Sequence, residues 1–179
     1  MNRNIATLAL ASALLSTAAY AQSAGEKTGV NSMLGIAPKT EDFIKEAALS
    51  DMLEIDAAKI AQQKGDSEEK TFAGEMITDH TKTSTELKGM VSGEMKAALP
   101  ASLDDSSQKK LDKLRDATPE DFASEYDSMQ VSAHKDAVSL FERYAKGGDD
   151  PKLTDWAGKT LPTLQHHLEM AQDMNKNRK

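Results

Sequence analysis

The chain has 179 residues, no cysteine, 4% aromatic residues and a formal net charge of −7. The missing cysteine excludes a disulfide framework, a thiolate zinc site and a cysteine nucleophile. The acidic balance excludes a typical nucleic-acid binder, which needs a basic patch to neutralise phosphates. With only 10 glycines and 5 prolines, the chain is neither collagen-like nor of low complexity.

Residues 1–21 have the features of a secretory signal peptide. An apolar run follows the basic residue Arg3, and the small-x-small tripeptide at 19–21 fits a cleavage site. The run is too short for a membrane span, and no later stretch approaches spanning length. We expect cleavage between Ala21 and Gln22 and export to a bacterial periplasm, with an uncleaved anchor as the alternative. Loss of Arg3 changes the net charge from −7 to −8.

The mature chain divides into a leader and a helical domain. Residues 22–39 contain glycines, a proline and no apolar periodicity, which predicts a flexible leader. Over residues 40–176 apolar side chains recur every three or four positions, and no alternating run is long enough for a strand. The sequence therefore predicts an all-α domain over this range.

Capping signals divide the domain into four long helices and one short one. Threonine, serine or aspartate precedes the expected first turns, and glycine follows several last turns. Pro162 lies inside the last helix and is expected to kink it. The expected helices are 40–64 with Thr40 as N-cap, from Asp66 or Ser67 to about Leu99, 104–116, 119–147 after the N-cap Thr118, and 151–175 after the N-cap Asp150.

The lengths of the connections predict the topology. Short connections join the first long helix to the second and the third to the fourth, so each pair is expected to form an antiparallel hairpin. The link over residues 98–118 has enough chain, ~20 Å of helix and ~26 Å of extended residues, to run from one end of a bundle to the other. We predict a ferritin-like four-helix bundle whose long crossover between helices 2 and 3 contains the short helix. Simple up-and-down connectivity is the alternative.

Histidines are the main candidates for chemistry. His80, His134 and His167 fall on the apolar stripes of three different helices, and Glu54 falls on the stripe of the remaining long helix. The neighbouring His166 points about 100° away and is expected to be exposed. Helical bundles assemble metal sites from inward side chains on facing helices. Imidazole with carboxylate suits zinc, iron, manganese or copper, so these four residues form a candidate site for one transition-metal ion.

The same residues also have a structural interpretation. A histidine on an apolar face is more often a core residue that is hydrogen-bonded to a neighbour, such as Tyr126, Glu54 or Asp79, than a metal ligand. Methionines on the same helices would suit Cu(I), but methionine is also the ordinary gap filler of helical cores. The methionines concerned are Met76, Met129, Met170 and Met174.

Several spaced segments resemble a known family. They are FIKEAALSDMLEIDAAKIA, FAGEMITDH, YDSMQVSAHKDAVSLFERYA and LPTLQHHLEMA. They are similar to the domain-of-unknown-function family 4142, exported bacterial proteins with a ferritin-like bundle. The resemblance covers about residues 40–176 and implies no activity. It implies that family positions are occupied by Glu54, His80, His134 and His167, whereas His166 is not at one.

Enzymatic motifs are missing from the sequence. Ferritin-like di-metal enzymes use Glu-x-x-His pairs, but Ile77 and Leu164 stand three residues before His80 and His167. The chain also lacks a Gly-x-Ser-x-Gly elbow and a phosphate-binding loop. We therefore expect no di-iron oxidase or ferroxidase. The first functional hypothesis is a non-catalytic periplasmic bundle that acts in envelope or stress physiology through a protein partner; the alternative is a mononuclear metal-binding protein. The oligomeric state is not predicted.

Overall fold

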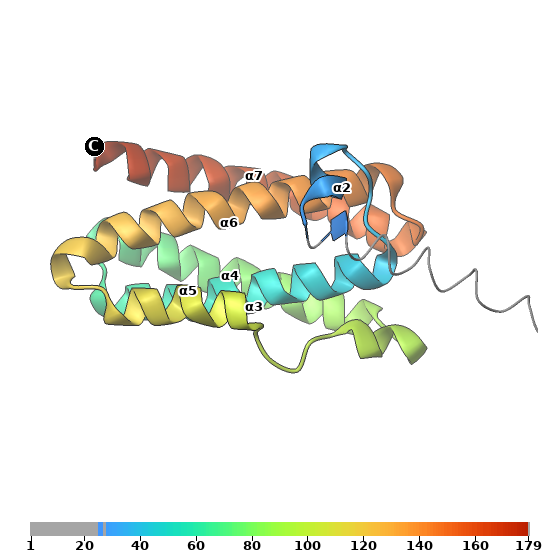
Figure 1. The fold of residues 1–179 in the computed structure, drawn as a ribbon, viewed down its shortest axis with the longest axis horizontal. Helices are drawn as coiled ribbons and strands as arrows, with labels where there is room; N and C mark the ends of the chain where they lie inside the picture. The colour runs from blue at the N-terminus through green and yellow to red at the C-terminus, as the bar shows by residue number, and fades with distance from the viewer. Residues whose placement is uncertain (1–24, 27, 179) are drawn as a thin grey trace, which may run out of the picture.

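The computed structural model describes residues 25–26 and 28–178, and the predicted signal peptide lies outside them (Figure 1). The described residues contain helices and no strand, which confirms the all-α fold class. No helix among them is long and apolar enough to cross a membrane. The elements are α2 (Val30–Met33), α3 (Thr40–Lys64), α4 (Ser67–Met90), the 3₁₀ helix η1 (Gly93–Ala98), α5 (Asp105–Asp116), α6 (Pro119–Gly147) and α7 (Pro151–Asn177).

Side-chain caps start three of the four long helices as predicted. The Asp66 carboxylate accepts bonds from the backbone N–H groups of Glu68 and Glu69 at the start of α4, and the Glu69 carboxylate accepts the backbone N–H of Asp66. This reciprocal pair is a capping box, which satisfies donors that a helix start leaves unpaired. Thr118 caps α6 and Asp150 caps α7, each with proline at the first helical position.

The predicted role of Thr40 is wrong. Thr40 is the first residue of α3, and the N-cap is Lys39, whose side chain makes no capping bond. The Thr40 hydroxyl is instead hydrogen-bonded to the Tyr144 hydroxyl, 2.6 Å away, and to the Asp149 carboxylate. These long-range bonds take the place of a local cap, and they tie the start of α3 to the end of α6.

Helix α4 ends earlier than predicted, at Met90 instead of about Leu99. The backbone turns extended at Val91, and Gly93 adopts a left-handed conformation with φ of 58°, which glycine accepts without steric cost. The six residues Gly93–Ala98 then form η1. The apolar pattern therefore continues past the end of α4 into η1, and the sequence analysis did not distinguish this 3₁₀ helix from the α-helix before it.

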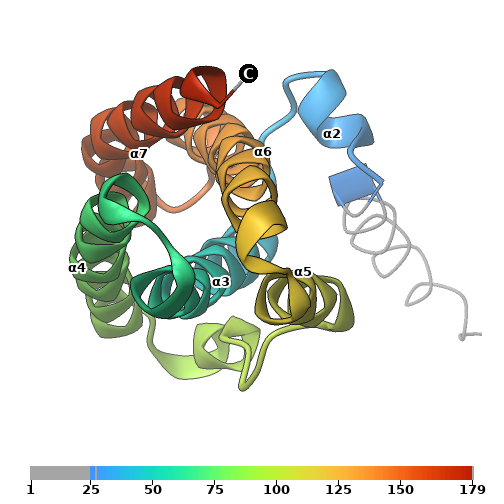
Figure 2. The same cartoon turned by 90° about the vertical axis from the view of Figure 1, so that its left-hand side faces the viewer.

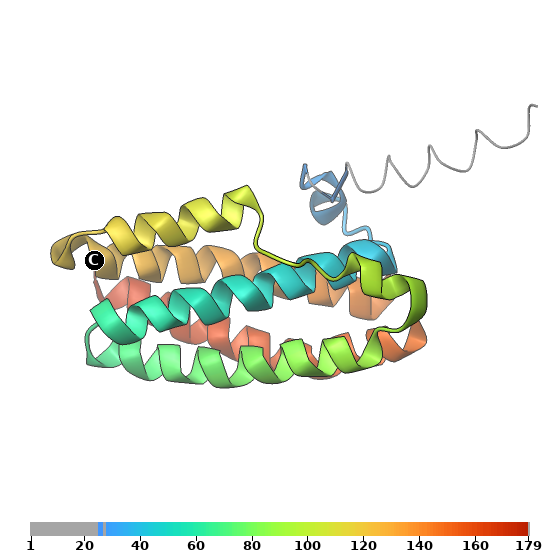
Figure 3. The same cartoon turned by 90° about the horizontal axis from the view of Figure 1, so that it is seen from below.

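The four long helices form a bundle in which α3 neighbours α4 and α6, and α7 closes the ring between α4 and α6 (Figure 2). The α3–α4 and α6–α7 pairs are antiparallel hairpins (Figure 1). Helices α4 and α6 lie on a diagonal and run in the same direction, because η1 and α5 carry the chain back along the bundle between them (Figure 3). The long crossover is thus confirmed, and the up-and-down alternative is wrong.

The crossover is packed against the bundle. Leu111 and Leu114 on α5 are buried, and α5 contacts α3 and α6. The ammonium of Lys64, at the end of α3, donates to the carbonyls of Leu114, Arg115 and Ala117 at 3.2, 2.6 and 2.7 Å. These carbonyls belong to the last turn of α5 and its C-cap, where a cation also complements the helix dipole.

The described part of the predicted leader contains α2, a short helix that the sequence analysis did not expect. The guanidinium of Arg143 on α6 donates to the Ile36 carbonyl at 2.6 Å and pairs with the Glu26 carboxylate. The hydroxyls of Ser32 and Ser139 are 3.0 Å apart. These contacts hold the described leader residues against α6 (Figure 2).

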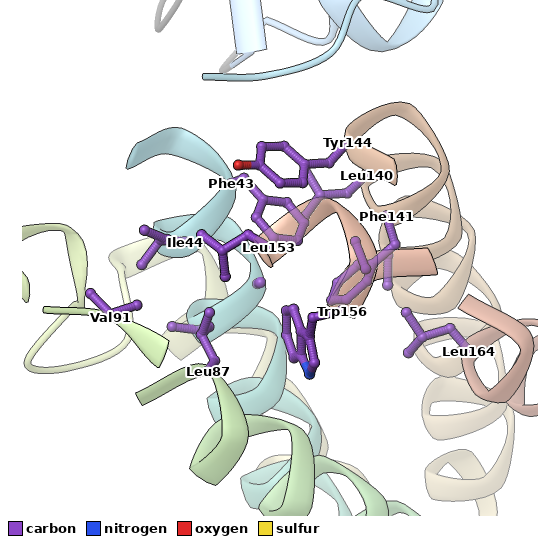
Figure 4. Packing of buried hydrophobic residues seen from close by; sticks show 14 residues of the cluster. Phe43, Ile44, Leu87, Val91, Leu140, Phe141, Tyr144, Leu153, Trp156 and Leu164 are labelled. Atoms are coloured by element: carbon purple, nitrogen blue, oxygen red, sulfur yellow. The ribbon is translucent and has the colours of Figure 1, made fainter. Parts of the chain in front are cut away.

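Two hydrophobic clusters fill the bundle. The first contains the start of α3 and the ends of α4 and α6, where Phe43 stacks on Tyr144 with ring centroids 3.8 Å apart (Figure 4). Trp156 joins this cluster and donates its indole N–H to Glu86 at 2.9 Å. The second contains the end of α3, the start of α4 and residues of α5, α6 and α7, among them Phe72 and Tyr126.

One end of the bundle is closed by an arginine near the C-terminus. The Arg178 guanidinium donates to Asp127 at 2.6 Å and to Asp66 at 3.0 Å, and lies 3.2 Å from Glu69. Asp127 and Glu69 are buried, and burial raises the pKa of both carboxyl groups. Partial burial opposes the charged form of Arg178, but the bonds to Asp127 and Asp66 outweigh it and raise its pKa.

Arg178→Ala is expected to lower the free energy of unfolding by about 2 kcal/mol, because it leaves two buried carboxylates without their cation. This energy is set below that of a fully buried ion pair because the Arg178 side chain is partly exposed. Urea unfolding checks it, with Arg115→Ala as the matched control. Among the described residues, the Arg115 guanidinium pairs with Asp112 alone, and both side chains are exposed. That variant should therefore lose less than about 1 kcal/mol. Equal losses in the two variants would contradict the proposed role of Arg178.

Candidate metal centre

A polar layer separates the two hydrophobic clusters. On α4, α6 and α7 it falls between residues of one cluster and residues of the other; on α3 Asp51 does so, whereas Glu54 stands between Leu53 and Ala57 of the second cluster. On α4, for example, His80 follows Met76 of the second cluster and precedes Leu87 of the first; on α7, His167 lies between Leu164 and Ala171. The buried members of the layer are Asp51, Glu54, His80, Thr83, Gln130, His134 and His167.

The three histidines meet inside this layer. The ring centroids are 5.7 Å apart for His80 and His134, 5.6 Å for His80 and His167, and 5.4 Å for His134 and His167. One ring nitrogen from each residue lies within 4.8 Å of one from each of the others. Each side chain is at most 2% exposed. Helices α4, α6 and α7 thus bring three imidazoles to the same level of the bundle.

Each imidazole is held by one of its nitrogens. His80 Nδ1 donates to Asp51 Oδ1 at 2.8 Å, and the same oxygen accepts the Thr83 hydroxyl at 2.7 Å. His134 Nδ1 donates to the Gln130 carbonyl, one turn earlier on α6, at 3.0 Å.

The third imidazole, that of His167, is oriented from another helix. Its Nε2 donates to Asp79 Oδ2 on α4 at 3.0 Å. All three rings are therefore oriented by an oxygen acceptor.

The opposite nitrogen of each ring has no hydrogen-bond partner in the part of the chain that the structure describes. Among the described residues, His80 Nε2, His134 Nε2 and His167 Nδ1 are buried without a hydrogen bond. Both carboxylate oxygens of Glu54, the Tyr126 hydroxyl and the Gln130 side-chain amide share this state. Unpaired buried polar atoms are rare in proteins, and each costs about 1–3 kcal/mol when left unsatisfied. All of these atoms except the Tyr126 hydroxyl lie in the polar layer, which indicates that the layer has a role beyond packing.

The electrostatics of the site favour at least two neutral imidazoles. Burial lowers the pKa of His134. Burial, with the neighbouring His134 and His80, lowers the pKa of His167 to about 4, against the opposing effect of Asp79. Burial also acts against the charged form of His80, but the bond to Asp51 and the charge of Glu54 outweigh it and raise its pKa. Neutral imidazole is the form that binds metal ions.

A scan against protein-family models matches residues 25–174 to the family described as a domain of unknown function, DUF4142. The chain belongs to this family. The match includes every residue of the polar layer, from Asp51 to His167. No curated protein and no solved structure matches the chain in the same comparisons. DUF4142 membership assigns no activity to the chain.

The structure brings together three of the four predicted site residues of this DUF4142 chain. His80, His134 and His167 come together, and His166 is exposed, as expected. Glu54 is buried beside them, since its charge raises the pKa of His80, but it is not in the group whose ligand atoms lie within 4.8 Å of one another. The four methionines named as copper candidates lie in or against the second hydrophobic cluster.

The sequence analysis missed two of the oxygens that orient the histidines. Asp51 and the Gln130 carbonyl were not named, whereas Asp79 was named as a possible neighbour and does bond His167. Asp51 carried a usable signal, because it stands three residues before Glu54 and so on the same side of α3. The Gln130 carbonyl carried none, because a backbone acceptor has no signature in sequence.

Proposed function

We propose that the bundle binds one transition-metal ion through His80 Nε2, His134 Nε2 and His167 Nδ1. The observation that carries this proposal is the difference between the two nitrogens of each ring: one donates to an oxygen, and the other is buried and has no partner among the described residues. Metal-ligating histidines have this arrangement, since the outer acceptor sets both the tautomer and the orientation of the ring. A single cation would satisfy three unpaired nitrogens at once.

The interpretation as hydrogen-bonded core histidines explains only half of each ring. It accounts for the bonds to Asp51, the Gln130 carbonyl and Asp79, but among the described residues it leaves the second nitrogen of each buried ring without a hydrogen-bond partner. Burying such groups without compensation is unfavourable. Metal binding accounts for both halves of each ring, and it explains why three helices place imidazoles at one level.

The donors favour zinc among the metals considered. Three imidazole nitrogens leave one position of a tetrahedral ion open, and zinc imposes no geometric preference of its own. Glu54 is buried in the same layer, and its carboxylate oxygens have no hydrogen-bond partner among the described residues. It is the residue that would supply the fourth ligand or hold a bound water. Iron, manganese and copper also bind imidazole and carboxylate ligands. Binding of one of these metals in place of zinc is a competing outcome of the test.

Metal stoichiometry tests the proposal. The chain is stripped with a chelator, dialysed against zinc, iron(II), manganese(II) or copper(I), and analysed for bound metal. We expect one ion per chain, with zinc retained through exhaustive dialysis. Failure of all four metals to bind stoichiometrically would overturn the proposal and favour a structural bundle that acts through a protein partner in envelope or stress physiology.

We further propose that the chain is exported through residues 1–21. The supporting pattern is the basic start, the apolar run and the cleavage motif before Gln22. The periplasm is oxidising and converts cysteine pairs to disulfides. A metal site without cysteine ligands is not subject to this oxidation. N-terminal sequencing of protein recovered from a periplasmic fraction should begin at Gln22; recovery of an intact N-terminus from the membrane would support an uncleaved anchor instead.

A further inference from the structure

His167 differs from the other two histidines in where its outer partner lies. The partner of His80 is Asp51, whose side chain is 7% exposed, and the partner of His134 is a backbone carbonyl of the fully buried Gln130. The partner of His167 is Asp79, whose side chain is 32% exposed. Of the three rings, His167 is therefore the one that connects the polar layer to solvent through its hydrogen bond.

A second carboxylate lies beside this connection. Glu75 and Asp79 are four residues apart on α4 and so share one face of the helix. A carboxylate oxygen of each and a ring nitrogen of His167 all lie within 4.8 Å of one another. Both carboxylates are half-buried, and the imidazole is buried. Two carboxylates and one imidazole are a ligand set suited to zinc, iron or manganese.

Asp79 also lines a groove that opens to solvent between α4 and α7. The groove has a volume of about 570 Å³, and its other lining residues include Thr83, which bonds Asp51 of the histidine layer. The charged lining residues balance, because Lys82, Lys152 and Lys159 stand against Asp79, Glu86 and Asp155. Lys159 is paired with Asp155, which reduces its repulsion of an incoming cation. A hydrated ion thus has room to reach Asp79 from the surface.

We propose that Glu75, Asp79 and Nε2 of His167 form an outer capture site through which the metal ion reaches the three buried histidines. This inference rests on the proposed function. The outer and inner sites share one imidazole, and a neutral imidazole offers one lone pair at a time. The two sites are therefore successive positions of one ion, and the chain holds one ion, not two.

The proton of His167 changes position when the ion moves inward. In the outer position Nε2 binds the ion and Nδ1 carries the proton. In the inner position Nδ1 binds the ion, and Nε2 carries the proton and donates it to Asp79, as in the structure. His167 loses one proton from Nδ1 and gains one at Nε2, so no net proton is gained or lost in the transfer.

Rapid-mixing measurements of zinc loading test the capture site. Metal-free full-length protein is mixed with zinc in competition with a chromogenic chelator, and Glu75→Gln is compared with wild type. We expect loading to slow about fivefold or more, because Glu75 is one of the three ligands of the capture site and its negative charge raises the local cation concentration there. The equilibrium affinity should change less than twofold. Removal of zinc by excess chelator should then slow by the same factor, since the ion leaves by the route it entered.

The matched control is Glu94→Gln, which makes the same change of charge at an exposed residue of η1. It should load and release zinc at wild-type rates. Loading of Glu75→Gln at the wild-type rate, in protein that does bind one zinc, would overturn the capture site and leave the buried site standing. If wild type itself binds no metal, the proposed function fails, and the capture site fails with it.

A second variant separates capture from ring orientation. Asp79→Asn removes an outer ligand and also the anionic acceptor of His167 Nε2. It is expected to slow loading and to weaken the equilibrium affinity by about tenfold or more, because outer-acceptor changes at metal-bound histidines have effects of that size. A loss of affinity with unchanged loading rates would show that Asp79 acts only in orienting the ring, and would overturn its role in capture.

Discussion

Replacing His134 with alanine should abolish the thermal stabilisation that zinc gives to the wild-type protein. A ligand that binds only the folded state stabilises it by about 4 kcal/mol at a thousandfold excess over its dissociation constant. For a domain of this size that corresponds to an increase of ~10 °C in Tm. His134 is 1% exposed, and its Nε2 has no other partner among the described residues, so its removal takes away one of three ligands.

The matched control for this experiment is His166→Ala. His166 is adjacent to His167 in sequence but exposed, so the variant removes an imidazole without changing the layer. Differential scanning calorimetry with zinc, and again with chelator, measures both variants. In chelator, His134→Ala also reports the cost of the cavity alone. Zinc shifts of equal size in the two variants would contradict the assignment of His134 as a ligand.

The metal-free protein should lose stability as the pH falls from about 6.5 toward 4. His167 has a pKa of about 4 in the folded chain, lowered by burial and by the two other histidines, and about 6.5 when unfolded. Between these values the unfolded chain binds a proton that the folded chain does not, so acidification favours unfolding. The full shift corresponds to about 3 kcal/mol, present above pH 6.5 and lost by about pH 4.

Urea unfolding at several pH values, in chelator, measures this dependence in wild type and in His167→Gln. The comparison matters because other groups act in the opposite direction. Burial raises the pKa of Asp51, Glu69 and Asp127, and each then binds protons more readily when folded. The difference between the two curves isolates His167. Parallel curves over this range would contradict the depressed pKa of its imidazole.

The local parts of the fold were predictable because they are encoded locally. Asp66, Thr118 and Asp150 start helices with short-range bonds between neighbouring residues, and Pro119 and Pro151 mark the same points. The prediction failed where a distant partner competes. Threonine is a common N-cap residue, but the hydroxyl of Thr40 is hydrogen-bonded to Tyr144 and Asp149, which are more than a hundred residues away. The end of α4 was missed because apolar spacing is similar in α and 3₁₀ turns.

The candidate site was predictable only as a set of inward residues. Apolar stripes placed His80, His134 and His167 toward the core, because helical periodicity decides direction. Whether the three lie at one level depends on how far each helix slides along its neighbours, and that distance is fixed by tertiary packing. The same holds for Glu75, which acquires a role only because α7 brings His167 against α4.

The polar layer also has a consequence for how the four helices align. Sliding any one of them by a turn, about 5 Å, would move its histidine or carboxylate among the aromatic and aliphatic side chains of a cluster. An apolar core alone tolerates such slippage, since one leucine replaces another. A buried polar group does not, because it would lose its hydrogen-bond partner. The layer therefore fixes the register of the four helices, in the way that a single buried asparagine fixes the register of a coiled coil.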